Sequence, residues 1–151
     1  MAKKVDQDSL ASQYEQMGER PWSYLTAVLK KWESEVGEVL ESFEVTRVQL
    51  EFLMCVSKFE TEGRPATQKN LAAALGRAKN TASEAFRNLE KKGYIVRSPG
   101  EADLREKHVV LTEKGWRLVE KAFREVTLVD RRLFPDDRDN EELIRLLKKY
   151  L

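Results

Sequence analysis

The 151-residue sequence predicts a mainly α-helical protein with one small β-hairpin. Apolar residues recur at helical spacing over most of the chain, and one short stretch after Gly93 has strand-like composition and leads into a Pro-Gly turn. Charged residues make up 35% of the chain against 41% apolar, which is the balance of a soluble globular protein with one core.

Several classes of protein are excluded by what the sequence lacks. It has no run of about 18 apolar residues that would span a membrane, and its first residues lack the apolar core of a secretory signal, so we expect a cytoplasmic protein. Cys55 is the single cysteine and His108 the single histidine, so we expect no disulfide, no metal and no cofactor. No phosphate-binding glycine loop or His-Glu-x-x-His motif is present, which predicts that the protein is not an enzyme.

The N-terminal region, residues 1–45, is predicted as a polar arm of about 20 residues followed by a long helix. From Trp22 to Leu40 the apolar residues follow 3.6-residue spacing, and their stripe includes Trp22 and Trp32. Such a stripe is wide for a small monomer to cover, so we expect a second copy of the chain to bury it. The alternative is that the two ends of one chain pack on each other.

The central region, residues 46–115, begins with two predicted helices. Thr46 is suited to cap a helix that ends near Phe59, and Thr67 to cap a shorter one. Gly76 ends the shorter helix because glycine readily adopts the backbone conformation of a tight turn.

A third helix is predicted from Lys79 to Lys92, and it has two distinct faces. Its apolar face consists of Ala82, Ala85, Phe86 and Leu89, and its polar face of Asn80, Ser83, Glu84, Arg87 and Lys91. Two short helices joined by a tight turn form a helix-turn-helix, and a helix with this polar face fits the major groove of double-stranded DNA. We therefore expect DNA as a partner.

A β-hairpin follows, with strands predicted at residues 94–97 and 107–111 and a loop that carries Arg105. A hairpin in this place is the wing of a winged helix-turn-helix, and an arginine near its tip suits the negative minor groove. Residues 64–115 hold eleven Lys and Arg against six Asp and Glu, although the whole chain has a net charge of only +1. The positive charge is thus concentrated in the region predicted to contact DNA.

The C-terminal region, residues 116–151, is predicted to contain two helices within the same structural domain. The first starts at Thr112, and the second, residues 142–151, follows a break at residues 134–137. Together with the N-terminal helix they are predicted to form a dimer interface. Its residues are Trp22, Leu25, Leu29, Trp32, Trp116, Phe123, Leu143 and Leu147.

Five short segments occur in a specific order and spacing: residues 71–75, 80–83, 89–95, 103–105 and 111–115. The sequence from Thr46 to about Phe123 resembles the MarR family of transcriptional regulators in these segments and in their spacing. The resemblance implies a homodimer with both chain ends at the interface and two winged modules on a pseudo-palindromic site. It also implies a repressor. In many members of the family a small lipophilic or phenolic ligand releases the repressor from DNA, and in some members cysteine oxidation does so.

Three positions depart from the family pattern. Leu104 stands in the wing where an arginine is usual, and Arg77 stands in the turn where an apolar residue is usual. Glu84 lies on the third predicted helix, the recognition helix, where an arginine is common. Glu84 either accepts a hydrogen bond from a cytosine amino group or forms a capping box with Thr81. A competing hypothesis is therefore a protein–protein interaction module whose Glu84 face docks on another protein.

The residues predicted to contact DNA are Thr67, Lys79, Asn80, Thr81, Ser83, Glu84, Arg87, Asn88, Lys91, Arg105 and Lys107. Phosphate contacts are expected from Lys79, Lys91, Lys92 and Arg105, and base contacts from Asn80, Ser83, Glu84 and Arg87. Asp103 is predicted to pair with Arg105 and stiffen the wing. Cys55 is predicted to be a buried small hydrophobe, because its neighbours in the helix are apolar. The alternative is a redox-sensing thiol, which needs exposure and a nearby cation such as Lys58.

Overall fold

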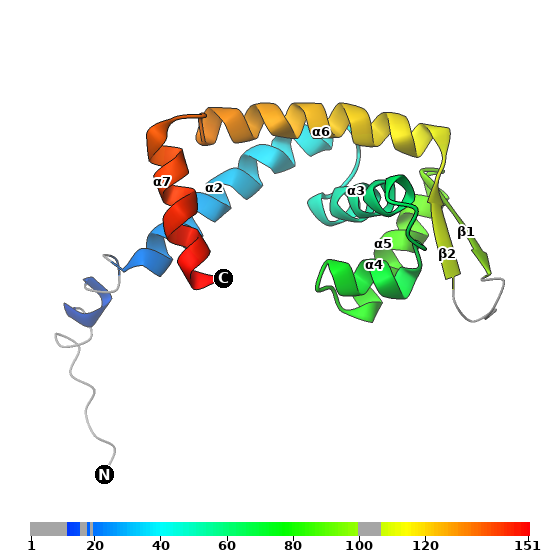
Figure 1. The fold of residues 1–151 in the computed structure, drawn as a ribbon, viewed down its shortest axis with the longest axis horizontal. Helices are drawn as coiled ribbons and strands as arrows, with labels where there is room; N and C mark the ends of the chain where they lie inside the picture. The colour runs from blue at the N-terminus through cyan, green and yellow to red at the C-terminus, as the bar shows by residue number, and fades with distance from the viewer. Residues whose placement is uncertain (1–11, 16–17, 19, 100–106) are drawn as a thin grey trace, which may run out of the picture. The chain divides into compact units, whose positions relative to one another are not determined.

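The computed structural model describes residues 12–15, 18, 20–99 and 107–151, and the chain divides into two compact units, Met1–Glu35 and Val36–Leu151 (Figure 1). Helix α2 (Pro21–Glu41) belongs to both units and confirms the long N-terminal helix. Its buried residues are Val36 and Leu40, near its C-terminal end. The first part of its predicted apolar stripe, Trp22, Leu25, Val28 and Leu29, is exposed.

Helix α3 (Arg47–Thr61) runs through the core of the second unit. Thr46 caps it as predicted: its hydroxyl accepts from the amide of Gln49, and its own amide donates to Gln49 Oε1, each at 3.2 Å, which completes a capping box. Phe52 and Val56 are fully buried. The ring of Phe52 lies 4.7 Å from that of Phe86 on α5, so α3 and α5 share one aromatic contact at the centre of the core.

Helices α4 (Gln68–Ala74) and α5 (Lys79–Lys91) form the predicted helix-turn-helix, which lies against α3 (Figure 1). Gly76 has a φ of +59°, the left-handed conformation that the tight turn requires. The buried residues of α5 are Ala82, Ala85, Phe86 and Leu89, the apolar face that the sequence predicted.

Strands β1 (Ile95–Pro99) and β2 (Lys107–Leu111) pair antiparallel, with Ile95 opposite Leu111. The hairpin is confirmed, although β1 starts one residue later than predicted and extends to Pro99. The amide of Val109 donates to the carbonyl of Ala66 at 2.8 Å, which fixes β2 to the connection between α3 and α4.

Helix α6 (Glu113–Leu133) begins after its predicted cap Thr112 and ends at the predicted break. Helix α7 (Arg138–Leu147), followed by the short 3-10 helix η1 (Lys148–Tyr150), starts four residues earlier than predicted. The reason is Asp137, whose side chain accepts from the amide of Asn140 and so caps the helix. Among the described residues, no helix is long and apolar enough to cross a membrane.

Candidate nucleic-acid interface

The exposed face of α5 gathers most of the residues that the sequence predicted to contact DNA. Ser83 is half-buried, and the exposed members are Lys79, Asn80, Thr81, Glu84, Arg87, Asn88 and Lys91. Because one helix carries them and its other face is buried, they form a single polar surface. Lys107, at the start of β2, is also exposed. The predicted wing pair of Asp103 and Arg105, like Leu104, lies outside the described residues.

The prediction that Thr67 contacts DNA is not supported by its position. The residue is 1% exposed, and its hydroxyl accepts from the amide of Asn70 at 3.2 Å to cap α4. Thr67 also forms an isolated bridge with His108 of β2. Strand β2 thus covers Thr67, and the structural role of this residue is to cap α4.

Of the two alternatives for Glu84, the structure excludes the capping box with Thr81. Helix α5 begins at Lys79, and its cap is Ala78, which has extended backbone and makes no side-chain capping bond. Thr81 therefore lies inside the first turn, where it cannot cap the helix. Glu84 remains on the exposed face of α5 with its carboxylate available to a partner.

The C-terminal end of α5 is fixed to the wing by an ion pair. Arg97 on β1 donates from Nε to Glu90 Oε2 at 2.9 Å, and its Nη2 donates to the same oxygen. These bonds from Arg97 lower the pKa of Glu90, against a smaller opposing effect of burial. Strand β1 and the recognition helix are therefore held together by charge as well as by packing.

Lys92, which was expected to contact phosphate, has a protein acceptor instead. Its ammonium group donates to the carbonyl of Glu44, in the connection between α2 and α3. The carbonyl of Lys92 in turn accepts from Lys114 Nζ at 2.8 Å. Lys92 thus ties the end of the recognition helix to two neighbouring segments.

The segment Leu111–Gly115 of the sequence pattern has a clear structural reason. The hydroxyl of Thr112 donates to the carbonyl of Gly93 at 2.7 Å, and its amide donates to the carbonyl of Tyr94 at 3.0 Å. A Cβ atom on Gly115 would lie 2.1 Å from the oxygen of Tyr94. Glycine is therefore required in the first turn of α6, because the backbone there packs against the carbonyl of Tyr94, just after α5.

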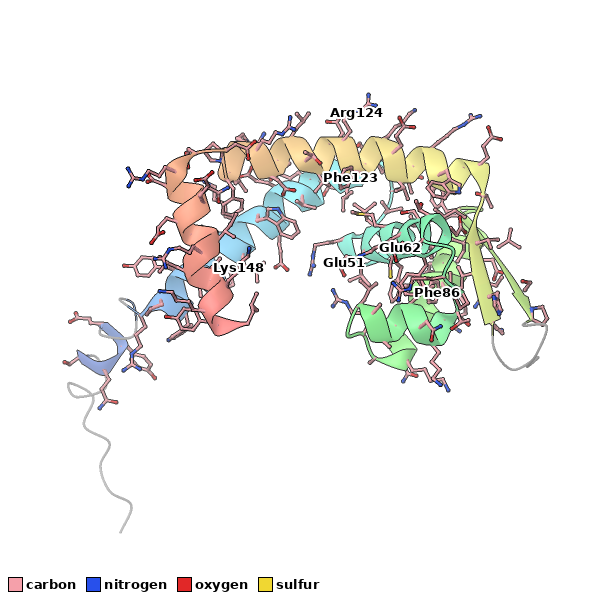
Figure 2. All side chains as sticks on the ribbon, in the orientation of Figure 1. Glu51, Glu62, Phe86, Phe123, Arg124 and Lys148 are labelled. Atoms are coloured by element: carbon pink, nitrogen blue, oxygen red, sulfur yellow. The ribbon has the colours of Figure 1, made fainter. Side chains whose placement is uncertain are left out.

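The turn before α5 is held by a contact that the sequence did not reveal. Arg77 Nη2 lies 2.5 Å from Glu51 Oε2, and the other oxygen of Glu51 accepts from Arg47. Figure 2 labels Glu51 on α3 and Phe86 on α5. The spacing of Arg47 and Glu51 by four residues was the only local signal of this cluster.

A hollow of about 610 Å³ lies among α3, the end of α4 and α6. Its apolar wall includes Cys55, Phe59 and Phe123, and its cationic groups are Lys58 and Arg64. The guanidinium of Arg64 lies 3.8 Å from the centre of the Phe59 ring.

Cys55 is buried, as predicted, and burial raises the pKa of its thiol, although the nearby cations Arg64 and Lys58 oppose the shift. The thiolate that oxidation requires is therefore disfavoured. In the part of the chain that the structure describes, no group of three or more His, Cys, Asp and Glu side chains is placed to hold a metal ion.

The residues predicted for a dimer interface differ in their exposure. Trp22 and Leu29 on α2 are 52% and 51% exposed, and Phe123 on α6 is 53% exposed. The other exposed members are Leu25, Trp116 and Leu143, whereas Trp32 and Leu147 are half-buried.

Two short helices joined by a left-handed glycine turn and followed by an antiparallel hairpin define a winged helix-turn-helix protein. The MarR family model matches residues 45–107. The chain is 33% identical over 131 residues to the uncharacterized HTH-type transcriptional regulator YdcH of Bacillus subtilis, covering 87% of this chain and 89% of that protein. The chain belongs to the MarR family, whose members are transcriptional regulators and not enzymes.

Solved structures share this fold. A mutant of MarR from E. coli, complexed with operator DNA, superposes with a TM-score of 0.74 at 23% identity, covering 85% of this chain and 91% of that one. CouR from Rhodococcus jostii RHA1, bound to p-coumaroyl-CoA, gives a TM-score of 0.70 at 21% identity, with coverage of 84% and 85%. These likenesses show the fold, and the role of a MarR-type transcriptional regulator rests on the family match and the related regulators.

Proposed function

We propose that the protein is a homodimeric repressor whose two winged modules bind a pseudo-palindromic operator and which a small lipophilic or phenolic ligand releases. The observation that carries this proposal is the single exposed polar face of α5, since its opposite face is buried in the core. Asn80, Ser83, Glu84 and Arg87 would read bases from this face, and Lys79 and Lys91 would contact phosphates. Such a regulator would act in the cytoplasm.

The exposed apolar face of α2 supports the dimer. Trp22, Leu25 and Leu29 are each about half exposed, and a protein in water gains free energy when a second copy covers such side chains. A twofold dimer presents two copies of α5, which matches the symmetry of a pseudo-palindromic site.

The hollow beside α3 supports control by a ligand. Its volume of about 610 Å³ is within the range of sites for small molecules. Aromatic walls at Phe59 and Phe123 suit a phenolic or lipophilic body.

Selection of bound duplexes from a random pool tests the proposed function. We expect a symmetric motif whose half-sites are about 10 base pairs apart, centre to centre, because successive major grooves recur once per helical turn. Failure to enrich any motif, together with no salt-sensitive binding to nonspecific duplex at low salt, would favour a protein–protein interaction module with Glu84 on its docking face.

Arg87→Ala sharpens the assignment of base contacts. The variant should relax the preference at one position in each half-site of the selected duplex, at a cost of about 1–3 kcal/mol for the preferred base. The control Lys91→Ala should weaken binding to all duplexes about equally and reduce the salt slope by about one. An equal loss on every duplex from Arg87→Ala would rule out base reading by this residue.

A further inference from the structure

We propose that Arg77 is a positioning residue, which sets the start of the recognition helix by pairing with Glu51 on α3. The inference rests on the proposed operator binding. Arg77 lies in the turn before α5, and its partner is 26 residues away in the chain. The pair therefore joins the turn to the core helix of the module.

The first half of α5 has few other anchors. Its cap Ala78 makes no side-chain bond, and the buried residues of its first half are only the small Ala82 and Ala85, whereas Phe86 and Leu89 anchor the second half. The turn itself is bonded to α4, since the amide of Arg77 donates to the carbonyl of Ala72 at 2.9 Å. The side chain of Arg77 adds the bond that reaches from this turn to α3.

The ion pair is built to hold a fixed geometry. The Arg77 and Glu51 side chains are 31% and 26% exposed, so salt screens their attraction less than that of a surface pair. Arg47 holds the second oxygen of Glu51, which restricts the carboxylate to one orientation. Arg77 Nε is buried and has no hydrogen-bond partner within the described part of the chain, so the pair carries a desolvation cost. That cost favours a role in geometry over a role in stability.

The geometry of this turn matters for DNA because Asn80 and Ser83 lie just after it. Hydrogen bonds to base edges weaken steeply when the donor or acceptor is displaced, so tilting the start of α5 would impair base contacts at these residues. The direct alternative is that Arg77 itself contacts a phosphate. The two roles predict opposite effects of removing the charge of Glu51.

Affinity for the duplex selected above, measured with Glu51→Gln, separates the two roles. The substitution removes a negative charge and frees Arg77, so a direct phosphate contact predicts equal or tighter binding. Positioning predicts binding at least about fivefold weaker with an unchanged salt slope. Arg77→Gln should weaken binding to a similar extent, and the double variant should bind no more weakly than Arg77→Gln alone. Equal or tighter binding by Glu51→Gln, or additive losses, would overturn the proposal.

The matched control is Glu62→Gln, which makes the same charge change at the end of α3. The carboxylate of Glu62 pairs with Arg64 at 3.0 Å and with no residue of the turn among those described, so its removal should not weaken binding. A loss as large as that of Glu51→Gln would show a general effect of charge and refute the positioning role.

Hydrogen exchange without DNA distinguishes a failure of this inference from a failure of operator binding. The hydrogen-bonded amides of Gly76, Arg77 and Ala82 should exchange faster in Glu51→Gln and Arg77→Gln than in the wild type or Glu62→Gln. Unchanged exchange in both variants would overturn the proposal even if the wild type binds its selected duplex. If the wild type binds no duplex while exchange rises, operator binding fails and the hold of Glu51 on the turn is supported.

Discussion

The winged module buries its large apolar residues, whereas the first part of α2 and helix α7 leave theirs exposed. In the module, Phe52 and Phe86 are completely buried and contact each other. In the first part of α2, Trp22 and Leu29 remain about half exposed, and α7 has no buried residue. The module thus completes its own core, whereas the first part of α2 and helix α7 keep apolar side chains exposed.

The difference separates two sources of stability. Burial within one chain stabilises a fold at any protein concentration, whereas burial between copies depends on concentration by mass action. Substitutions in the module should therefore act on unfolding itself, and those on the exposed stripe of α2 should act on association.

Phe86→Ala gives the largest expected effect. Removal of this fully buried ring should lower the free energy of unfolding by about 3–5 kcal/mol, because the contact with Phe52 is lost and a cavity is left. Urea denaturation at several protein concentrations measures the loss, which should not vary with concentration. Phe123→Ala is the matched control, since Phe123 is 53% exposed. Its loss should be smaller and should depend on protein concentration; equal losses would remove the contrast between the two regions.

Leu29→Glu tests whether the exposed apolar stripe of α2 is the dimer interface. Placing a carboxylate within the apolar stripe of α2 should raise the dimer dissociation constant at least about tenfold, or about 1.4 kcal/mol, with helix content unchanged. Sedimentation velocity measures the shift. Lys30→Gln changes the net charge by the same amount beside the stripe and should leave the dimer intact. Association unaffected by Leu29→Glu would mean that this face is not the interface.

Local signals account for what the sequence predicted well. Thr46, Thr67 and Thr112 each cap a helix through a bond to the amide three residues on, and Gly76 ends α4 with positive φ. Such features involve neighbouring residues and leave a pattern in the sequence. The apolar face of α5 was equally readable because its period is that of a helix.

Contacts between distant residues left no such pattern. Lys92 is predicted to contact phosphate, but its ammonium group donates to a carbonyl 48 residues away. Arg77 departs from the family pattern, and only the structure shows that it pairs with Glu51. Thr67 is confirmed as a cap, and its burial, which bears on the predicted DNA contact, follows only from the pairing of β2 beside it. Sequence reasoning therefore found the elements of the site and missed the side chains that fix their relative positions.

Thr67→Ala tests that correction with a smaller effect. Loss of the capping bond to the amide of Asn70 should lower the free energy of unfolding by about 1 kcal/mol, and Thr67→Ser should restore most of it. Chemical denaturation measures both changes. DNA affinity well below the unfolding temperature should stay close to that of the wild type. Weaker DNA binding with unchanged stability would return Thr67 to the interface.

The smallest expected effect is on the pH dependence of stability, and it comes from two ion pairs, one in the module and one on α7. Arg97 lowers the pKa of Glu90 in the module, and Arg145 lowers that of Glu142 on α7. A carboxylate whose folded pKa lies below its ordinary value of about 4.5 adds stability above that pH and loses it as the pH falls through the folded pKa. The Arg97 side chain is 15% exposed and that of Arg145 is 57% exposed, so solvent screens the pair on α7 more strongly.

Urea midpoints from about pH 7 down to about pH 3 should therefore separate the two pairs. Glu90→Gln should be less stable than the wild type at neutral pH, and the difference should shrink as the wild-type carboxylate becomes protonated. Glu142→Gln should follow the wild type at every pH, because a screened surface pair contributes little. A larger pH-dependent loss from Glu142→Gln than from Glu90→Gln would mean that α7 is covered by a partner in solution and that its ion pair belongs to a buried interface.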